Sequence, residues 1–298
     1  MKHYKTISQL HQSSGYPAPE NPMLSLLTCN ELNKCSIGEN KFTSDFYIVA
    51  LKKIKSGNFL YGKTKYDHDN GSMSFVKPRQ AMEISNVEMA EKAMIIFIHE
   101  DYFLGHNLHS DIKKFGFFDY ETNEALHLSP SEEQIIWELY DKINREYKNN
   151  SDEFSKDIIL THIDSILKYA QRFYKRQFIN RKVISGSMVS KFSDILSSYF
   201  ESGLLQQKGL PTVTYLASQL NLSSRYLSDL LKQETGKTAL EHIHIFLIDE
   251  AKNLLMSTDN TIAETAYQLG FENPPYFSRL FKKETGITPI EYKEQFLN

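Results

Sequence analysis

The chain has 298 residues, of which 41% are hydrophobic and 24% are charged, and its formal net charge is −3. A chain of this length has room for two domains of ordinary size, each with its own hydrophobic core. The composition is that of a globular protein and excludes collagen-like, disordered and disulfide-dense chains, while the charge shows no basic excess of the kind that nucleic-acid-binding proteins often carry.

Further features indicate where the protein works. Apolar runs such as residues 93–98 are far too short to span a membrane, and the start of the chain lacks the apolar core of a signal peptide. Cys29 and Cys35 have no histidine nearby in the sequence, so both are expected to be thiols rather than metal ligands. Two cysteines in a chain of this size fit a reducing compartment, and the sequence predicts a cytoplasmic protein.

The first third of the chain has the pattern of short β-strands. Residues 46–54 form a β-branched and aromatic run, and residues 59–61, after a turn, fit a hairpin partner. An Asn70-Gly71 turn precedes the next predicted strand, residues 72–76. Residues 93–98 are apolar throughout and predict a strand that is buried on both faces. Short strands separated by turns predict a β-sandwich or barrel.

Helical periodicity begins after this β region. Ser129 is an N-cap candidate, a proline follows at the first helical position, and Glu132 completes a capping box. A second helix is predicted for residues 154–178, where apolar residues recur at helical spacing. This helix can pack on its own sheet or against the same helix of a second subunit. We prefer the second arrangement, which predicts a homodimer.

The most basic segment of the chain follows. Residues 165–191 contain seven lysines and arginines and no acidic residue. Two interpretations remain open: a solvated helix face with a linker, or an additional contact with nucleic-acid phosphates.

The C-terminal third contains an internal repeat. The phrase LKQETGKTALEH (residues 231–242) returns as FKKETGITPIEY (residues 281–292), and the aligned copies share thirteen identities over about thirty positions. Each copy has an N-cap threonine, a residue that tolerates left-handed backbone at a turn, a cap for a second helix and a glycine that ends it. These residues are Thr212, Asn221, Ser223 and Gly236 in the first copy and Thr261, Gly270, Asn273 and Gly286 in the second.

These helix caps and turn residues predict two helix-turn-helix units. A short turn between two closely packed helices is the arrangement that places the second helix in the major groove of DNA. Between the copies, residues 238–256 are predicted to form one helix, apolar around most of its circumference and buried between the units. Its length of about 28 Å is close to one DNA turn, so the two second helices could enter successive grooves.

These motifs carry a family resemblance. The segment from about Leu204 to the C-terminus, and above all TIAETAYQLGFENPPYFSRLFKKETGITPIEY (residues 261–292), resembles the DNA-binding domain of the AraC/XylS family of bacterial transcription regulators. The preceding β region, with GSMSFVKPRQ (residues 71–80), resembles the cupin-type sensing and dimerisation domain of many family members. The resemblance implies an α+β chain with a cupin-like domain and dimerisation helices at residues 1–180, a linker at 181–203, and an all-α DNA-binding domain at 204–298.

The resemblance also implies a function. The expected protein is a sequence-specific transcription regulator that binds double-stranded DNA and RNA polymerase, forms a homodimer and can respond to a small organic effector. No cofactor, metal or membrane contact is expected. The effector, the operator and the sign of regulation stay open.

The outward positions of the two second helices are the candidate DNA contacts. Arg279 is the best base reader, because guanidinium pairs bidentately with guanine, and Lys282 and Lys283 suit phosphates. The full set is Ser224, Arg225, Ser228, Asp229 and Lys232 in the first unit and Asn273, Pro275, Ser278, Arg279, Lys282 and Lys283 in the second.

Three positions depart from the pattern of the family. Asp229 stands where many relatives carry a basic residue, and it could accept a hydrogen bond from cytosine or repel phosphate. Leu247 and Glu250 replace arginines that are common on the linking helix. Residues 204–298 also contain nine basic against eleven acidic residues.

Two other functional classes were weighed. A cupin-like metalloenzyme would need clustered ligands, but the spacing of His99, His106 and His109 fits neither a helical pair nor a His-x-His cluster, so no enzyme is expected. An adaptor that uses its helical units for protein contacts is the other alternative. Aromatic residues Phe46, Tyr47, Tyr61 and Phe75 would suit an effector pocket, whereas Phe115, Phe117, Phe118 and Tyr120 are expected in the core.

Overall fold

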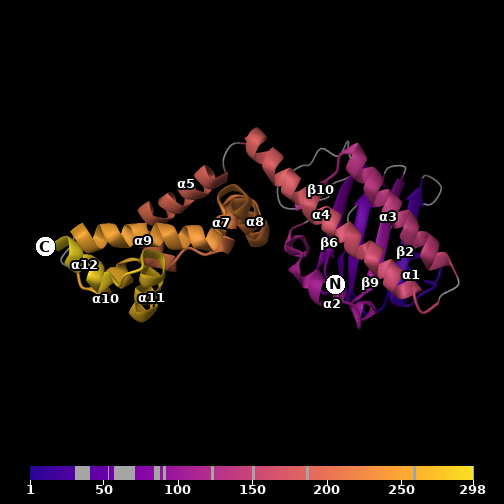
Figure 1. Ribbon diagram of the computed structural model, residues 1–298, viewed down its shortest axis with the longest axis horizontal. Helices are drawn as coiled ribbons and strands as arrows, with labels where there is room; N and C mark the ends of the chain where they lie inside the picture. Colours follow the sequence, from indigo (N-terminus) through magenta and orange to yellow (C-terminus); the bar gives the residue numbers. More distant parts are fainter. Residues whose placement is uncertain are drawn as a thin grey trace. The chain divides into compact units, whose positions relative to one another are not determined.

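The computed structural model describes residues 1–30, 41–52, 54–56, 71–83, 88–89, 92–121, 124–149, 152–185, 188–257 and 260–297. The chain forms two compact units, residues 1–180 and residues 181–298. A β-sheet unit followed by a helical unit confirms the predicted α+β, two-domain organisation (Figure 1). Within the described ranges, no helix is both long enough and apolar enough to cross a bilayer.

A five-stranded sheet is the centre of the N-terminal unit. Its strands are β2 (Leu24–Asn30), β4 (Phe46–Lys52), β6 (Ser72–Val76), β9 (Lys92–His99) and β10 (Leu126–His127). Their order is β10-β6-β4-β9-β2, and every neighbouring pair is antiparallel. Residues 93–98 are buried without exception, as predicted for a central strand.

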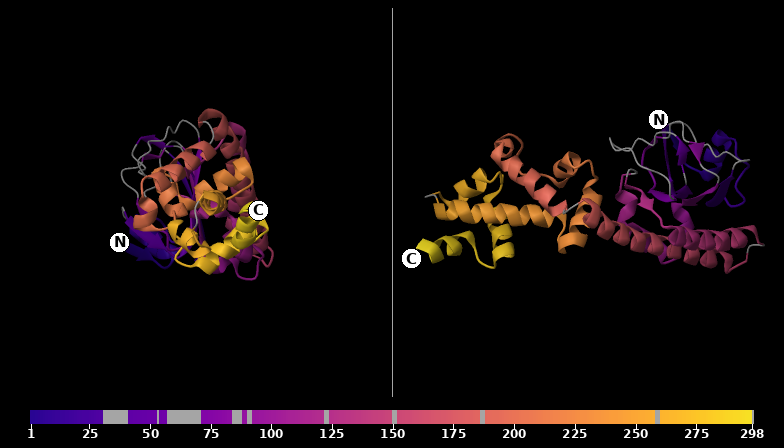
Figure 2. Two further views of the ribbon diagram at one scale, coloured as in Figure 1. Left: turned by 90° about the vertical axis from the view of Figure 1, so that its left-hand side faces the viewer. Right: turned by 90° about the horizontal axis from the view of Figure 1, so that it is seen from above.

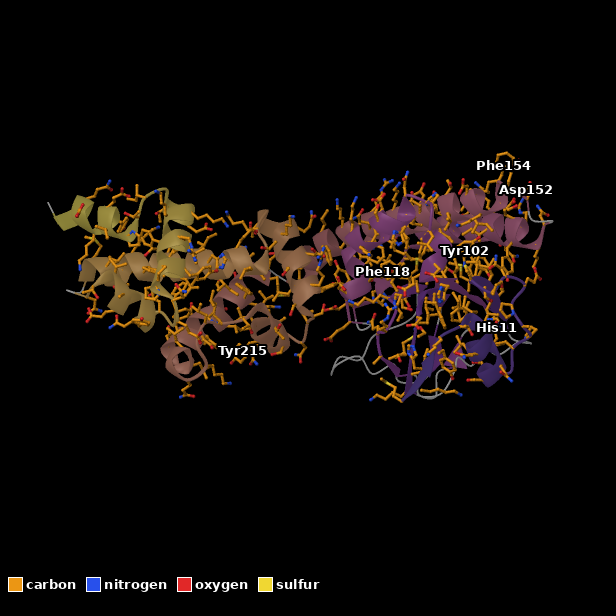
Figure 3. The ribbon with its side chains drawn as sticks, turned by 90° about the horizontal axis from the view of Figure 1, so that it is seen from below. His11, Tyr102, Phe118, Asp152, Phe154 and Tyr215 are labelled. Carbon is orange, nitrogen blue, oxygen red and sulfur yellow. The ribbon has the colours of Figure 1, made fainter. Side chains whose placement is uncertain are left out.

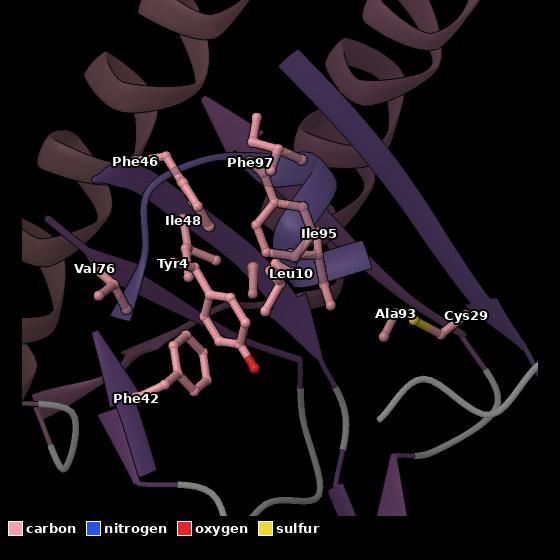
Figure 4. Packing of buried hydrophobic residues seen from close by; sticks show 12 residues of the cluster. Tyr4, Leu10, Cys29, Phe42, Phe46, Ile48, Val76, Ala93, Ile95 and Phe97 are labelled. Carbon is pink, nitrogen blue, oxygen red and sulfur yellow. The ribbon is translucent and has the colours of Figure 1, made fainter. Parts of the chain in front are cut away.

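Small β-elements cover one face of this sheet. A second sheet has the order β1 (Lys2–Tyr4), β3 (Lys41–Ser44) and β7 (Met82–Glu83), and helix α1 (Ile7–Ser14) follows β1. Side chains from these elements and from alternate positions of β4 and β9 form one buried cluster (Figure 4). A third pair consists of β5 (Ile54–Ser56) and β8 (Glu88–Met89), so the predicted strand 46–54 is divided in two. Residues 59–61 and Asn70 lie outside the described residues.

Two long helices cover the other face. Helices α3 (Pro130–Lys148) and α4 (Ser155–Ser185) run side by side across the sheet (Figures 1 and 2). Helix α3 begins as predicted, with both hydrogen bonds of the Ser129–Glu132 capping box present. Between β9 and β10 lie short helical turns, η1 (Glu100–Phe103), α2 (Leu108–Asp111), η2 (Ile112–Lys114) and η3 (Gly116–Asp119).

The apolar stripe of α4 packs within its own unit. Ile163, Leu167 and Ala170 are fully buried, and the Tyr174 hydroxyl donates to the Glu124 carbonyl at 3.0 Å. This is the first of the two arrangements given for this helix and not the preferred one, and a homodimer stays a prediction. Large apolar side chains still face solvent near its start: Phe154, just before the helix, is 63% exposed and directed away from the helix pair (Figure 3).

The aromatic residues proposed for an effector pocket do not share one face. Phe46 lies in the cluster under α1, whereas Tyr47 and Phe75 pack on Phe118 on the opposite face, with ring centroids 5.1 and 5.7 Å apart. Tyr61 lies outside the described residues. Because consecutive strand residues point to opposite faces, Phe46 and Tyr47 cannot line one pocket, and that prediction is wrong.

The second aromatic prediction is confirmed. The side chains of the aromatic group at η3 are at most 7% exposed and lie in the core. Phe117 contacts Phe75 of the sheet, with ring centroids 4.4 Å apart, and stacks on Tyr174 of α4 at 5.6 Å. These rings therefore join the sheet to α4 and leave no cage for a ligand. The group consists of Phe115, Phe117, Phe118 and Tyr120.

The prediction that Cys29 is a thiol is wrong. Cys29 lies in β2, is buried, and is disulfide-bonded. Sequence spacing did not reveal this, because a disulfide depends on the approach of two Cβ atoms in the folded chain. Cys35 lies outside the described residues.

The C-terminal unit is built from eight helices within the described residues. They are α5 (Met188–Glu201), α6 (Leu204–Lys208), α7 (Val213–Gln219), α8 (Ser224–Thr235), α9 (Ala239–Ser257), α10 (Ile262–Gln268), α11 (Pro274–Thr285) and α12 (Pro289–Leu297). Helix α9 runs through the middle, with α7 and α8 at one end and α10 to α12 at the other (Figure 1).

Helix α5 occupies most of the segment that was predicted to be a linker. Phe192 and Leu196 are buried, and α5 packs on α6, α7 and α8. The Tyr199 hydroxyl donates to the Gly209 carbonyl at 2.9 Å. Residues 188–201 therefore belong to the C-terminal unit rather than to a connection between units.

Candidate nucleic-acid interface

The first helix-turn-helix unit consists of α7 and α8. The Thr212 hydroxyl accepts from the Tyr215 backbone N–H at 3.1 Å and caps α7, and Ser223 caps α8 through Tyr226 at 3.2 Å. Asn221 between the helices has a φ of 55°, the left-handed conformation predicted for this turn. The facing side chains are buried, which closes the helices on each other. They are Leu216, Ala217, Leu222, Leu227, Leu230 and Leu231.

The second unit, α10 and α11, repeats this construction. Thr261 and Glu264 form a complete capping box, and Asn273 caps α11 by accepting from the Tyr276 N–H at 3.1 Å. The hydrogen bonds from Thr261 hold the pKa of the Glu264 carboxyl below its usual value. Gly270 has the left-handed φ of 77° at the position of Asn221. The buried side chains are Ala266, Leu269, Phe271, Phe277, Leu280 and Phe281.

Helix α9 joins the two units. Its residues Ile243, Leu247 and Ala251 are buried, and the helix packs on α8 at one end and on α10, α11 and α12 at the other. Thr238 and Glu241 cap its start through mutual hydrogen bonds. Nineteen residues give α9 a length of about 28 Å, as predicted. Burial of Leu247 shows that this position is used for packing.

Gly270 is expected to tolerate alanine less well than Gly236. Both have left-handed φ angles, 77° and 80°, which cost a side-chain-bearing residue about 1–2 kcal/mol. A Cβ at residue 270 would also lie 2.9 Å from Leu205 Cδ1 and 3.4 Å from the Leu210 nitrogen, whereas nothing lies within 4 Å at residue 236. Urea unfolding of both alanine variants measures the difference. Equal losses would contradict the close packing of α6 on this turn.

None of the eleven predicted contact residues is buried in the hydrophobic core. Arg225, Lys232, Arg279, Lys282 and Lys283 are exposed, each on the second helix of its unit. The serines of both helices are half-buried, and Asn273 and Pro275 are exposed at the start of α11. Both second helices therefore turn polar or charged side chains outward, opposite the leucines and phenylalanines that face α7 and α10.

Asp229 lies beside a basic residue of its own helix. The Arg225 Nε donates to the Asp229 carboxylate Oδ2 at 3.0 Å. The Arg225 side chain is 47% exposed and that of Asp229 is 26% exposed. The acid is therefore neither isolated nor directed into the core.

A hollow of about 480 Å³ lies beside the start of α11. Lys208 and Gly209, at the end of α6, line it together with Asn273, Tyr276 and Arg279 of the second unit. Lys208 is not among the predicted contacts, because it stands just outside the repeat, which begins at Thr212.

Packing of α6 brings Lys208 to this position. Leu205 is buried against the Gly270 turn, and the Lys208 Nζ lies 5.4 Å from the ring centroid of Tyr215, which is labelled in Figure 3. In the sequence, a glycine directly after Lys208 could have indicated that a short helix ends there. Gly209 caps α6 and has a positive φ of 73°.

Two cations of the basic segment 165–191 are held by groups of their own unit. Arg176 donates to the Glu132 carboxylate at 2.7 Å and to the His127 carbonyl at 2.6 Å, which ties α4 to α3 and β10. Lys168 pairs with Asp164 at 2.6 Å on the same helix. The side chains of Arg181 and Lys182 lie outside the described residues. Arg176 and Lys168 thus serve local structure, whereas Arg172 and Lys175 are exposed.

The three histidines that were considered as metal ligands lie at the end of β9 (His99), before α2 (His106) and in α2 (His109). His99 Nδ1 accepts from the Asp101 N–H at 3.3 Å and caps η1, and His106 Nδ1 accepts from the Leu108 N–H at 3.0 Å. Throughout the described ranges, no three His, Cys, Asp or Glu side chains are grouped in a way that could hold a metal ion.

Comparison with known proteins identifies the C-terminal unit. Residues 216–295 match a family model described as a helix-turn-helix domain. The chain is 37% identical over 83 residues to YisR of Bacillus subtilis, an uncharacterized HTH-type transcriptional regulator, covering 28% of this chain and 29% of the relative. It is 34% identical over 82 residues to the HTH-type transcriptional activator RhaR of Cronobacter sakazakii, covering 28% and 29%.

A solved structure matches the same region. The C-terminal domain of AraT, a response regulator from Geobacillus stearothermophilus, is 31% identical, with a TM-score of 0.31, and the match covers 37% of this chain and 88% of that one. The matched segment spans less than a third of the length of YisR and RhaR. The family-model match and the matches to YisR and RhaR confirm the resemblance that residues 261–292 carry.

Proposed function

We propose that this chain, which belongs to the AraC-type helix-turn-helix proteins by its C-terminal domain, is a sequence-specific transcription regulator. The observation that carries the proposal is the pair of helix-turn-helix units packed on one long helix, α9, each with an exposed arginine on its second helix. A helix presented in this way enters the major groove, where arginine pairs with guanine. A chain with a net charge of −3 needs such localised contacts.

The roles of the individual residues follow from their positions. We assign base reading to Arg225 and Arg279, and phosphate contacts to Lys232, Lys282 and Lys283, since lysine acts as a point charge toward phosphate. The half-buried serines and the start of α11 suit contacts with the sugar-phosphate backbone. These residues are Ser224, Ser228, Asn273, Pro275 and Ser278.

Binding to a library of promoter duplexes tests the proposal. The full chain is expected to select particular sequences, and its affinity should fall linearly with the logarithm of the salt concentration, because bound phosphates release counterions. Fluorescence anisotropy at several salt concentrations measures both properties. Absence of binding at low salt would support the adaptor alternative instead.

Each phosphate-contacting lysine is expected to contribute to this salt dependence. Lys282→Ala and Lys283→Ala should each reduce the slope of log affinity against log salt by about 1, while the preferred sequence stays the same. Lys113→Ala removes the same charge from an exposed position in the N-terminal unit and serves as the control. An unchanged slope in both α11 variants would remove the phosphate assignment.

For the remainder of the chain we propose the roles that accompany such a DNA-binding domain. The N-terminal unit is a cupin-like sensing and dimerisation domain that takes a small organic effector, and the regulator contacts RNA polymerase as an activator. Phe154, just before α4, and Ile158, on its first turn, offer exposed apolar area to a second copy. A protein that reads chromosomal DNA works in the cytoplasm. None of these roles requires enzymatic catalysis or a cofactor.

A further inference from the structure

The starting point is the ion pair across one turn of α8. Arg225 and Asp229 are four residues apart, so their side chains lie above one another on the same helix face. The contact joins the Arg225 Nε to one carboxylate oxygen at 3.0 Å. Both side chains reach solvent on the outward face of the helix that the proposed function places in the major groove.

The atom used in this contact matters for recognition. A guanidinium group presents donors along two edges, one that includes Nε and one formed by the two terminal Nη atoms. A carboxylate at Nε turns the Nη edge away from itself, and two parallel Nη–H donors match the O6 and N7 acceptors of guanine. The ion pair also limits the rotamers of Arg225, which lowers the entropy that binding would cost.

The second unit lacks this arrangement. The repeat aligns Pro275 with Arg225, and Arg279 with Asp229, at an offset of 50 residues. Within the described part of the C-terminal unit, no carboxylate forms an ion pair with Arg279. Two helices with the same fold therefore present different chemistry: an arginine with a neighbouring acid on α8 and an arginine without one on α11.

We propose that Asp229 is a specificity-determining residue that holds Arg225 against a guanine in the groove contacted by α8. This inference rests on the proposed function and deepens it. Asp229 acts in two ways: it orients the Nη edge of Arg225, and its charge disfavours placement of the pair beside a phosphate. The DNA site consequently has two unlike halves, with the stricter guanine requirement in the half read by α8.

Selection from a random duplex library tests this inference with the full chain. The wild type, Asp229→Asn, Arg225→Ala and the double variant are each used to select duplexes, and affinities are then measured for the best duplex and its single-base variants. Asp229→Asn is expected to weaken the discrimination at one guanine by about tenfold, while binding to unrelated DNA becomes tighter because a negative charge is lost.

The other variants make the test specific. Arg225→Ala should lose discrimination at the same guanine, and the double variant should lose no more than Arg225→Ala does, because Asp229 acts through Arg225. Asp249→Asn is the matched control: it removes the same charge from an ion pair with Lys252 on α9, 2.9 Å long, and should leave base preferences unchanged. Circular dichroism verifies that each variant is folded.

Two results would overturn the inference. Unchanged base preferences in Asp229→Asn would show that the acid does not act through Arg225. A preference for cytosine that disappears in Asp229→Asn but persists in Arg225→Ala would show that Asp229 reads a base directly. If the wild type itself selects no sequence, the proposed function fails, and this outcome is distinct from both.

Discussion

Replacing Phe277 by alanine is expected to destabilise the C-terminal unit by about 3–5 kcal/mol, the usual loss for a fully buried phenylalanine. The side chain is 0% exposed, and its ring centroid lies 5.2 Å from that of Phe271 and 5.9 Å from that of Phe281. A cavity at this point removes the contact that closes α11 on α10. Because domains are stable by only about 5–15 kcal/mol, specific DNA binding should be lost with the fold.

The single tryptophan allows this loss to be assigned to one unit. Trp137 lies in α3 of the N-terminal unit, so its fluorescence follows that unit, whereas far-ultraviolet circular dichroism follows the helices of both. In urea, Phe277→Ala should shift a dichroism transition and leave the fluorescence transition in place. Tyr276→Ala, on the same helix but 43% exposed, should change little. A fluorescence transition that moves together with the dichroism transition would show that the units unfold as one.

Replacing Arg279 by alanine is expected to cost specific affinity without affecting stability. A bidentate arginine–guanine pair contributes about 1–3 kcal/mol of discrimination, or roughly 5- to 150-fold. Arg279 is exposed on α11 and makes no ion pair with a residue that the structure describes, so its loss leaves no buried charge behind. Affinity for the selected duplex should fall within this range, while affinity for unrelated duplexes should fall far less.

The control for Arg279 is an arginine outside the C-terminal unit. Arg145 is exposed near the end of α3, and Arg145→Ala changes the net charge equally. Anisotropy titrations against the selected duplex and against a shuffled one compare the two variants. If Arg279→Ala keeps the wild-type ratio between the two duplexes, Arg279 is not the base reader, and the assignment of α11 as a recognition helix loses its main support.

Local features of the C-terminal unit could be predicted because they depend on neighbouring residues. A threonine and a glutamate three positions apart form a capping box wherever the helix starts, as Thr261 and Glu264 do. The left-handed residue at each turn follows from the same short-range geometry. The Arg225–Asp229 contact also has the i, i+4 spacing of a helical ion pair and so could have been predicted from the sequence.

Distant contacts account for the errors and omissions. Arg176 resembled a phosphate contact in sequence, but a glutamate 44 residues earlier takes its guanidinium. Phe46 and Tyr47 resembled one pocket until the pairing of β4 placed them on opposite faces. Helix α5 was assigned to a linker although Met188, Phe192, Leu196 and Tyr199 follow helical spacing, because only its packing on α7 and α8 assigns it to a unit.

The amino-acid sequence by itself determined that the C-terminal part contains two helix-turn-helix units joined by a long apolar helix, since caps, turns and apolar stripes act over three or four residues. Only the tertiary structure decided which cations are held in local ion pairs, where Lys208 lies relative to Arg279, and that Cys29 is disulfide-bonded. Those outcomes depend on which segments far apart in the chain come into contact, and that is set by the burial of apolar surface over a whole unit rather than by any single motif.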